Sequence, residues 1–173
     1  GDLEVVAYNQ LNISGLNWAI ISTQQLEEVI AAKFEGEEVD FFTKYVQQYG
    51  YYDLFLIHPE GQVFYTVAHE ADYGTNMLNG TYMDSNLGRL VKKVLETRQF
   101  GMADFEPYAP SHDEPAAFIA QPVIHNDEIQ LVVALQLSLE GIDGIMQQRE
   151  GLGETEETYL VGSDKLMRSD SYL

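Results

Sequence analysis

Cysteine is absent from the 173 residues, which excludes disulfides, thiolate nucleophiles and Cys-based zinc or iron–sulfur sites. Basic side chains are scarce, with nine Lys and Arg against 28 Asp and Glu, so the net charge is −19. This balance argues against binding of nucleic acid or anionic lipid, because phosphate contacts need a basic patch. The acidity is otherwise typical of a soluble surface. No apolar run approaches the roughly 20 residues of a membrane span, and the first residues lack a signal-peptide pattern.

Recognisable catalytic and metal-binding motifs are also missing. The histidines fall in predicted turns or at strand ends without ligand spacing, and no serine lies in a GxSxG turn. Gly151-Leu152-Gly153 begins like a dinucleotide-binding loop. Glu156 stands in place of the third glycine, however, and no β-α-β unit surrounds the loop. We therefore expect no enzymatic activity, no metal and no cofactor.

What the sequence does contain is enough apolar material for a real core, at 45% hydrophobic and 12% aromatic residues. Residues 1–49 are predicted to form an N-terminal helical segment. Its long helix would begin near Leu3, although Gly15 weakens it, and a shorter helix would follow over residues 39–49. The apolar stripe that predicts the long helix steps by three or four residues and comprises Leu16, Ile20, Thr23, Leu26, Ile30 and Phe34.

From Tyr51 onward the apolar period changes to two, which is typical of strands. Strands are predicted over 54–57, 62–68, 102–106, 116–124 and 129–139, with a helix after Asp84 or Ser85 and another from Ile142. Hairpin connections imply an antiparallel sheet. The predicted fold class is α+β, with the long helix packed on a PAS-like five-stranded sheet over residues 50–148. Residues 149–173 are predicted to be a C-terminal extension that starts a truncated following module.

A ligand cavity is one of two interpretations of the last strand. Its odd positions are large and apolar, whereas Val132, Ala134, Gln136 and Ser138 are small or polar, so this face leaves room for a ligand or looks at water. Asp104, among apolar and aromatic neighbours, would suit an ammonium group, or would accept backbone N–H groups. Arg89, Arg98 and Arg168 could meet a carboxylate or pair with surface acids. The ligand-binding candidates are Tyr65, Asn76, Tyr82, Asp104, Tyr108, Phe118 and Gln136.

Residues 52–171 resemble a known family. The matching stretches include Asp53-Leu54-Phe55-Leu56-Ile57, Asp72-Tyr73-Gly74-Thr75-Asn76, Pro107-Tyr108-Ala109-Pro110-Ser111, Gly151-Leu152-Gly153-Glu154-Thr155 and Tyr159-Leu160-Val161-Gly162. Together they resemble the extracytoplasmic Cache (PAS-like) sensor region of bacterial methyl-accepting chemotaxis proteins and related sensor kinases. The resemblance implies a periplasmic domain between two membrane helices that binds a small molecule. Glu156 replaces a family glycine, and the Arg-x-Trp-Tyr pattern of amino-acid receptors is missing, so no ligand class follows.

The expected function is therefore ligand sensing by the periplasmic domain of a membrane-anchored chemotaxis receptor. A homodimer would form through the N-terminal helix. One alternative is the sensor of a histidine kinase or cyclic-nucleotide enzyme. Another is a partner-docking module without a small ligand, favoured if side chains fill the space beside Asp104 and Gln136. We infer a fragment of a longer chain, in which strand-like residues 158–161 pack back on the domain or pair with another copy.

Overall fold

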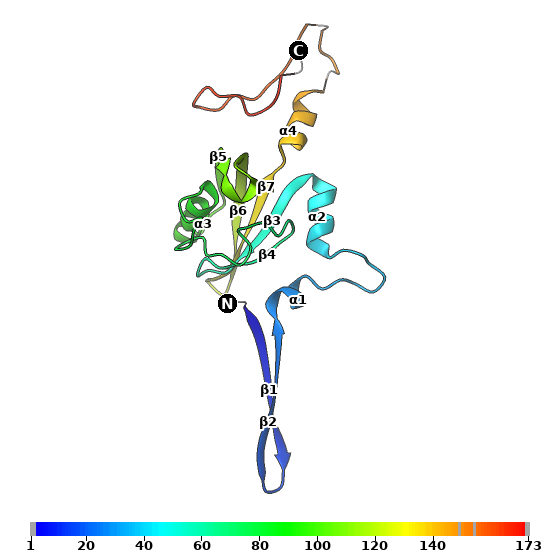
Figure 1. Cartoon of the computed structure of the whole chain (residues 1–173), viewed down its shortest axis with the longest axis vertical. Helices are drawn as coiled ribbons and strands as arrows, with labels where there is room; N and C mark the ends of the chain where they lie inside the picture. The colour runs from blue at the N-terminus through cyan, green and yellow to red at the C-terminus, as the bar shows by residue number, and fades with distance from the viewer. Residues whose placement is uncertain (1–2, 149, 154, 172–173) are drawn as a thin grey trace.

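The computed structural model describes residues 3–148, 150–153 and 155–171. A two-stranded hairpin projects from a body built of a five-stranded sheet with helices on both faces (Figure 1). The elements are β1 (Glu4–Ile13), β2 (Leu16–Gln25), α1 (Leu26–Ile30), α2 (Phe41–Tyr49), β3 (Tyr51–Ile57), β4 (Val63–Thr66), α3 (Asn86–Thr97), β5 (Gly101–Tyr108), a 3₁₀ turn (Ala109–Ser111), β6 (Glu114–His125), β7 (Glu128–Leu137) and α4 (Leu139–Met146).

The predicted long N-terminal helix is wrong. Strands β1 and β2 pair antiparallel, and the register Ile13↔Leu16 leaves Ser14 and Gly15 as the turn. Gly15 has φ +84°, a conformation that favours glycine. The apolar stripe misled because residues four apart, such as Leu16 and Ile20, share a face in a strand as well as in a helix. The many β-branched residues and the Ser-Gly turn favour the strand.

The shorter predicted helix is present as α2, and its two ends follow from local chemistry. Asp40 caps the N-terminus, where its Oδ1 accepts hydrogen bonds from the backbone N–H of Phe42 at 2.8 Å and of Thr43 at 3.1 Å. Gly50, with φ +70°, ends the helix. Val46 on α2 packs against Leu54 and other residues of the sheet, so α2 covers one sheet face.

The five-stranded antiparallel sheet of the prediction is confirmed, in the order β4-β3-β7-β6-β5. Strands β6 and β7 join through Asn126 and Asp127, which both have positive φ, at +49° and +61°. Residues Asp53 on β3 and Phe118 on β6 are both register partners of Gln136 on β7. These three side chains therefore lie in one row across the sheet.

Helix α3 covers the second face of the sheet, and this face holds the main core. Ser85 caps α3 by accepting the Gly88 N–H at 3.0 Å. The small residues Val132 and Ala134 of β7 lie fully buried beneath the helix, so side chains fill most of the face where a cavity was one interpretation. The opposite residues, such as Leu135, pack on the α1–α2 side. Only the Gln136 end of the small-residue face borders open space, described below.

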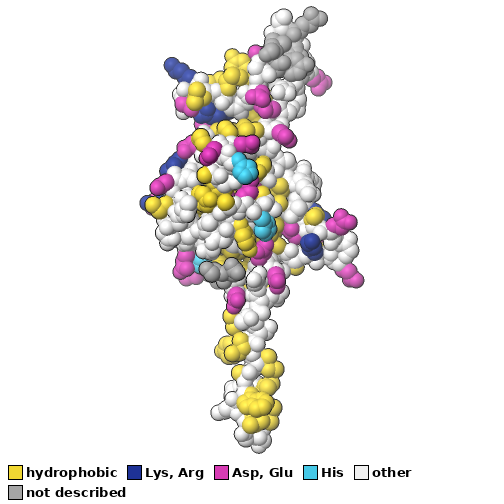
Figure 2. Space-filling model, in the orientation of Figure 1, with side chains coloured by type: hydrophobic (Ala, Val, Ile, Leu, Met, Phe, Trp, Pro, Cys, Tyr) yellow, Lys and Arg dark blue, Asp and Glu magenta, His cyan; other side chains and the backbone are white. Residues whose placement is uncertain are grey.

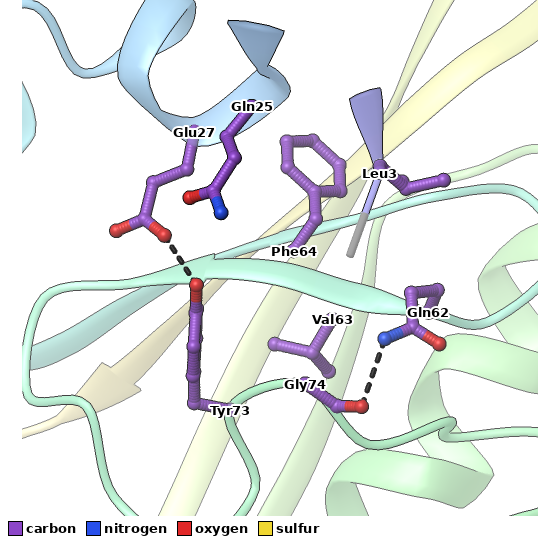
Figure 3. Close-up of a pocket in the computed structure, with 8 residues that line it drawn as sticks. All are labelled: Leu3, Gln25, Glu27, Gln62, Val63, Phe64, Tyr73 and Gly74. Carbon is purple, nitrogen blue, oxygen red and sulfur yellow. Dashed lines mark hydrogen bonds between the residues drawn. The ribbon is translucent and has the colours of Figure 1, made fainter. Parts of the chain in front are cut away.

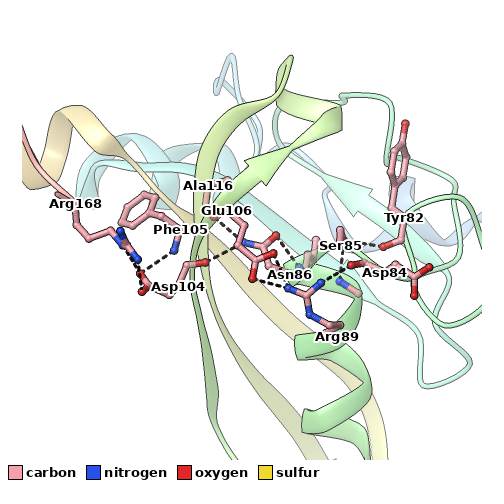
Figure 4. A network of polar contacts seen from close by, with 12 residues as sticks. Tyr82, Asp84, Ser85, Asn86, Arg89, Asp104, Phe105, Glu106, Ala116 and Arg168 are labelled. Carbon is pink, nitrogen blue, oxygen red and sulfur yellow. Dashed lines mark hydrogen bonds and ion pairs between the residues drawn. The ribbon is translucent and has the colours of Figure 1, made fainter. Parts of the chain in front are cut away.

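The chain beyond α4 folds back over the edge of the sheet. Residues 158–161 do not join the sheet; Val161 instead forms an isolated antiparallel bridge with Met167. Arg168 then reaches back to β5, where its Nη2 lies 2.9 Å from Oδ2 of Asp104 (Figure 4). Among the described residues, no helix has the length and apolarity to cross a membrane.

Candidate functional site

The crevice where the hairpin joins the body is too small to be a ligand site. Its open volume is about 10 Å³, which is near the minimum for one water molecule. Tyr73 donates a hydrogen bond to Glu27 across it, and Gln62 donates to the Gly74 carbonyl at 2.8 Å (Figure 3). These contacts tie α1 to the loop after β4, so the crevice is a structural joint.

A larger cavity, of about 230 Å³, lies where β7 ends and α4 begins. Ligand pockets for drug-sized molecules usually span 300 to 1,000 Å³, so this volume fits a smaller molecule. The wall combines apolar side chains with carboxylate, hydroxyl and amide groups. The lining residues are Tyr52, Ser111, Glu114, Pro115, Gln136, Leu137, Ser138, Leu139 and Glu140.

Asp53 is a fully buried carboxylate on β3, next to Gln136 in the sheet. Its Oδ1 accepts backbone N–H groups from Leu54 at 2.7 Å, Val67 at 2.8 Å and Ala68 at 3.0 Å. Burial raises the pKa of Asp53 to about 7, although these hydrogen bonds act to lower it, and the charge of Asp72 raises it further. Asp53 therefore changes charge near neutral pH.

Asp72, the second fully buried carboxylate, comes from the loop after β4. The hydroxyl of Tyr108 donates to its Oδ2 at 2.7 Å. Burial raises the pKa of Asp72, and burial together with the Asp72 charge also raises that of Tyr108. The Tyr108 ring packs edge-on against Phe118, with centroids 4.9 Å apart. Asp72 is thereby linked through Tyr108 to Phe118, a member of the row formed by Asp53, Gln136 and Phe118.

Three buried acceptor atoms in this region have no hydrogen-bond partner among the described residues: Asp53 Oδ2, Asp72 Oδ1 and Gln136 Oε1. A buried polar atom left unsatisfied costs about 1–3 kcal/mol, so three at one place need an explanation. All three can accept hydrogen bonds when the carboxyls are ionised. When both carboxyls are ionised, a donor is therefore what this site lacks. The group formed by Asp53, Asp72 and Gln136 is called the acceptor cluster below.

A chain of hydrogen bonds connects the acceptor cluster to Glu70. Tyr52 and Ser111 donate their hydroxyl protons to the two carboxylate oxygens of Glu70, at 2.7 Å and 2.8 Å. Gln136 Nε2 donates to the Ser111 oxygen at 3.2 Å. The Glu70 hydrogen bond raises the pKa of Tyr52 to about 12. The hydroxyl protons of Tyr52 and Ser111 are thus already used, and neither is left to serve the acceptor cluster.

The structure brings three of the seven predicted ligand residues together, Tyr108, Phe118 and Gln136, but only Gln136 lines the cavity, and the other two lie in the core. Tyr65 lies in the other core, where it donates to Asp40 at 2.9 Å. The Oδ1 of Asn76 accepts the Leu78 N–H at 2.9 Å and orders its own loop. The half-buried Tyr82 packs at the edge of the α3 core, so these three residues lie outside the cavity wall.

The apolar setting predicted for Asp104 is wrong. Its side chain is exposed, pairs with Arg168, and accepts the Phe105 N–H at 2.8 Å (Figure 4). Arg168 lowers the pKa of Asp104 below its usual range. A nearby network joins α3 to the sheet, where Asn86 donates to the Ala116 carbonyl at 2.7 Å. Asp53 and Asp72 were not among the predicted ligand residues, although the position of Asp53 directly before the apolar run Leu54–Ile57 was a usable signal of burial.

Comparison with solved structures gives a distant structural likeness. No family model matches the chain, and no curated protein matches it. Among solved structures, the sensor domain of the histidine kinase DctB from V. cholerae is similar, with 19% identity and a TM-score of 0.44. The likeness covers 63% of this chain and 39% of that structure. Similarity at this level does not establish a function.

Proposed function

We propose that the chain is the ligand-sensing extracytoplasmic domain of a chemotaxis-type receptor, and that its ligand is a small molecule bound in the cavity at the end of β7. The observation that carries the proposal is the wall of this cavity. Gln136 is only 4% exposed, lines the cavity, and has a buried carbonyl oxygen with no partner among the described residues. Binding of a donor group there would satisfy an atom that the fold itself leaves unsatisfied.

The position of the cavity supports a sensing role. Ser138, Leu139 and Glu140 line it and also form the start of α4. The Oγ of Ser138 caps this helix by accepting the Gly141 N–H at 3.1 Å. A ligand that contacts this turn differently in two arrangements of α4 would shift their populations, which is the requirement for a signal. The same mechanism would serve a histidine kinase or a cyclic-nucleotide enzyme as the output.

A partner-docking module is the second candidate, because of the projecting hairpin. Hydrophobic side chains gather on its surface (Figure 2), and Tyr8 and Trp18 are 82% and 58% exposed. Exposed apolar patches are typical of interaction surfaces.

The proposed homodimer would use this hairpin in place of the predicted helix. Light scattering of the chain and of Trp18→Ser should then show a dimer that the substitution weakens; a monomer at all concentrations contradicts it.

A thermal-shift screen with amino acids, amines, carboxylates and sugars tests the sensing proposal, because a ligand of the native state raises its stability. We expect at least one class to raise the midpoint, and Gln136→Leu to abolish the effect while the chain stays folded. Gln130→Leu is the matched control, since Gln130 is exposed on the same strand and lies outside the cavity. No shift with any class, or equal shifts in both variants, contradicts sensing at this site.

A further inference from the structure

The charged side chains that line the cavity are all acidic. Of its nine lining residues, all within the described part of the chain, none is Lys, Arg or His, whereas Glu114 and Glu140 are acidic. Glu70 contacts the lining residues Tyr52 and Ser111 through hydrogen bonds. Asp53 lies buried beside Gln136 in the sheet, and the charge of the buried Asp72 acts on Asp53. A carboxylate ligand would meet only like charge here, and a neutral ligand would leave this charge unbalanced.

The hydrogen-bonding groups in this region without a partner among the described residues are likewise acceptors. Gln136 lines the cavity and its buried Oε1 is an unpartnered acceptor, whereas Asp53 Oδ2 and Asp72 Oδ1 are unpartnered acceptors of buried residues outside the lining. The nearest hydroxyls, on Tyr52 and Ser111, already donate to Glu70. An ammonium group has three N–H donors, a positive charge and no acceptor, which matches this arrangement. The Tyr52 ring in the wall adds a surface for cation–π contact.

We infer that the ligand of this cavity is a small organic cation with a primary ammonium group, seated against Gln136 and attracted by the negative charge of Asp53 and Asp72. The inference rests on the proposed sensing function and adds the class of ligand. The volume of about 230 Å³ limits the ligand to a few carbons, and the side chains of Pro115, Leu137 and Leu139 provide the apolar part of the wall. The ligand would neutralise charge that the fold buries without a cation.

Calorimetric titration of the complete chain tests this with primary alkylammonium ions of two to five carbons, and with the alcohols and carboxylates of the same chain lengths. We expect binding of the ammonium series alone. Asp53→Asn and Asp72→Asn should each weaken it at least tenfold, because an amide removes charge and supplies an internal donor. Glu128→Gln is the matched control. It removes one charge about 26 Å along β7 from Gln136 and should leave affinity unchanged.

The possible results distinguish a failure of the ammonium assignment from a failure of the proposed sensing function. Binding of an alcohol or carboxylate that Gln136→Leu abolishes would leave the sensing site standing and overturn the ammonium assignment. No binding in this series or in the wider screen overturns both. Ammonium binding that survives Asp53→Asn and Asp72→Asn, or weakens equally in Glu128→Gln, also overturns the assignment, because it reflects only the net charge. Unfolding midpoints of each variant identify any that fail to fold, and Gln136→Leu then carries the test.

Discussion

The buried Asp53 should make the stability of the chain depend on pH in an unusual direction. Its pKa in the folded protein is about 7, compared with a reference value of 3.8, and burial is the main cause. Between these values the unfolded chain has released the proton while the folded protein retains it. The contribution of Asp53 to stability is therefore fully present below pH 3.8 and is lost as the pH rises through 7.

The magnitude follows from the same pKa difference. Each unit of pKa difference is worth about 1.4 kcal/mol, so the free energy of unfolding should fall by up to about 4 kcal/mol across this range. The total stability of a domain is about 5–15 kcal/mol, so the effect is large. Asp72, whose pKa burial also raises, acts with the same sign. Asp40 and Asp104, whose pKa values are lowered, act with the opposite sign.

Asp53→Asn isolates the contribution of this side chain, because the other groups remain in both proteins. The amide oxygen can still accept the N–H groups of Leu54, Val67 and Ala68, and the charge is gone. Urea unfolding at intervals from pH 4 to pH 8 should give similar stabilities at pH 4. At pH 8 we expect the variant to be more stable by about 2–4 kcal/mol.

Two results would refute this reasoning. If Asp53→Asn and the unchanged chain lose stability in parallel from pH 4 to pH 8, the charge of Asp53 is not costly in the fold. If the variant is less stable at every pH, the carboxylate is a net stabilising partner of the backbone amides around it. Glu128→Gln serves again as the control, because removal of a distant charge should shift both ends of the profile equally.

Three further outcomes follow from the geometry. Tyr108→Phe removes the hydroxyl that donates to Asp72 and should destabilise the fold by about 1–3 kcal/mol at pH 7 in urea unfolding, whereas an unchanged midpoint would contradict that hydrogen bond. Arg168→Gln should increase hydrogen exchange over residues 158–171, because Arg168 ties this segment to β5, and should leave the unfolding midpoint unchanged. Trp18 is the single tryptophan and lies exposed on the hairpin, so its fluorescence should be quenched readily by acrylamide, and a protected signal at low concentration would contradict the projecting hairpin.

The body of the fold could be predicted from the sequence because its signals are local. Alternation from Tyr51 onward, Asn126-Asp127 between two strands and Ser85 ahead of an apolar stripe each specify one element. The N-terminal hairpin could not be predicted from spacing alone, since its apolar residues satisfy both periods. Leu16 and Ile20 share a face in either structure, and the β-branched residues and the Ser14-Gly15 turn decide between them.

The candidate site was harder to predict, because it depends on contacts between distant segments. Gln136 is the one predicted ligand residue that lines the cavity, and the register of β6 and β7 places Phe118 beside it. Asp72 reaches them only through the loop after β4, at a sequence distance of 36 residues from Tyr108. Asp104 resembled a buried acid locally, yet Arg168, 64 residues later, balances its charge at the surface. Alternation along a strand does not show which carboxylate lies inside.

A binding role and a structural role for the acceptor cluster predict opposite effects of a single substitution, so one variant distinguishes the two roles. If the carboxylate stabilises the fold, the protein should lose stability when the carboxylate is replaced by its amide. A carboxylate kept to attract a cation should gain stability above pH 7 and lose affinity, because its buried charge costs free energy until the ligand balances it. Asp53→Asn measured in both assays therefore separates the two roles, since only the second predicts a more stable protein that binds ammonium ions more weakly.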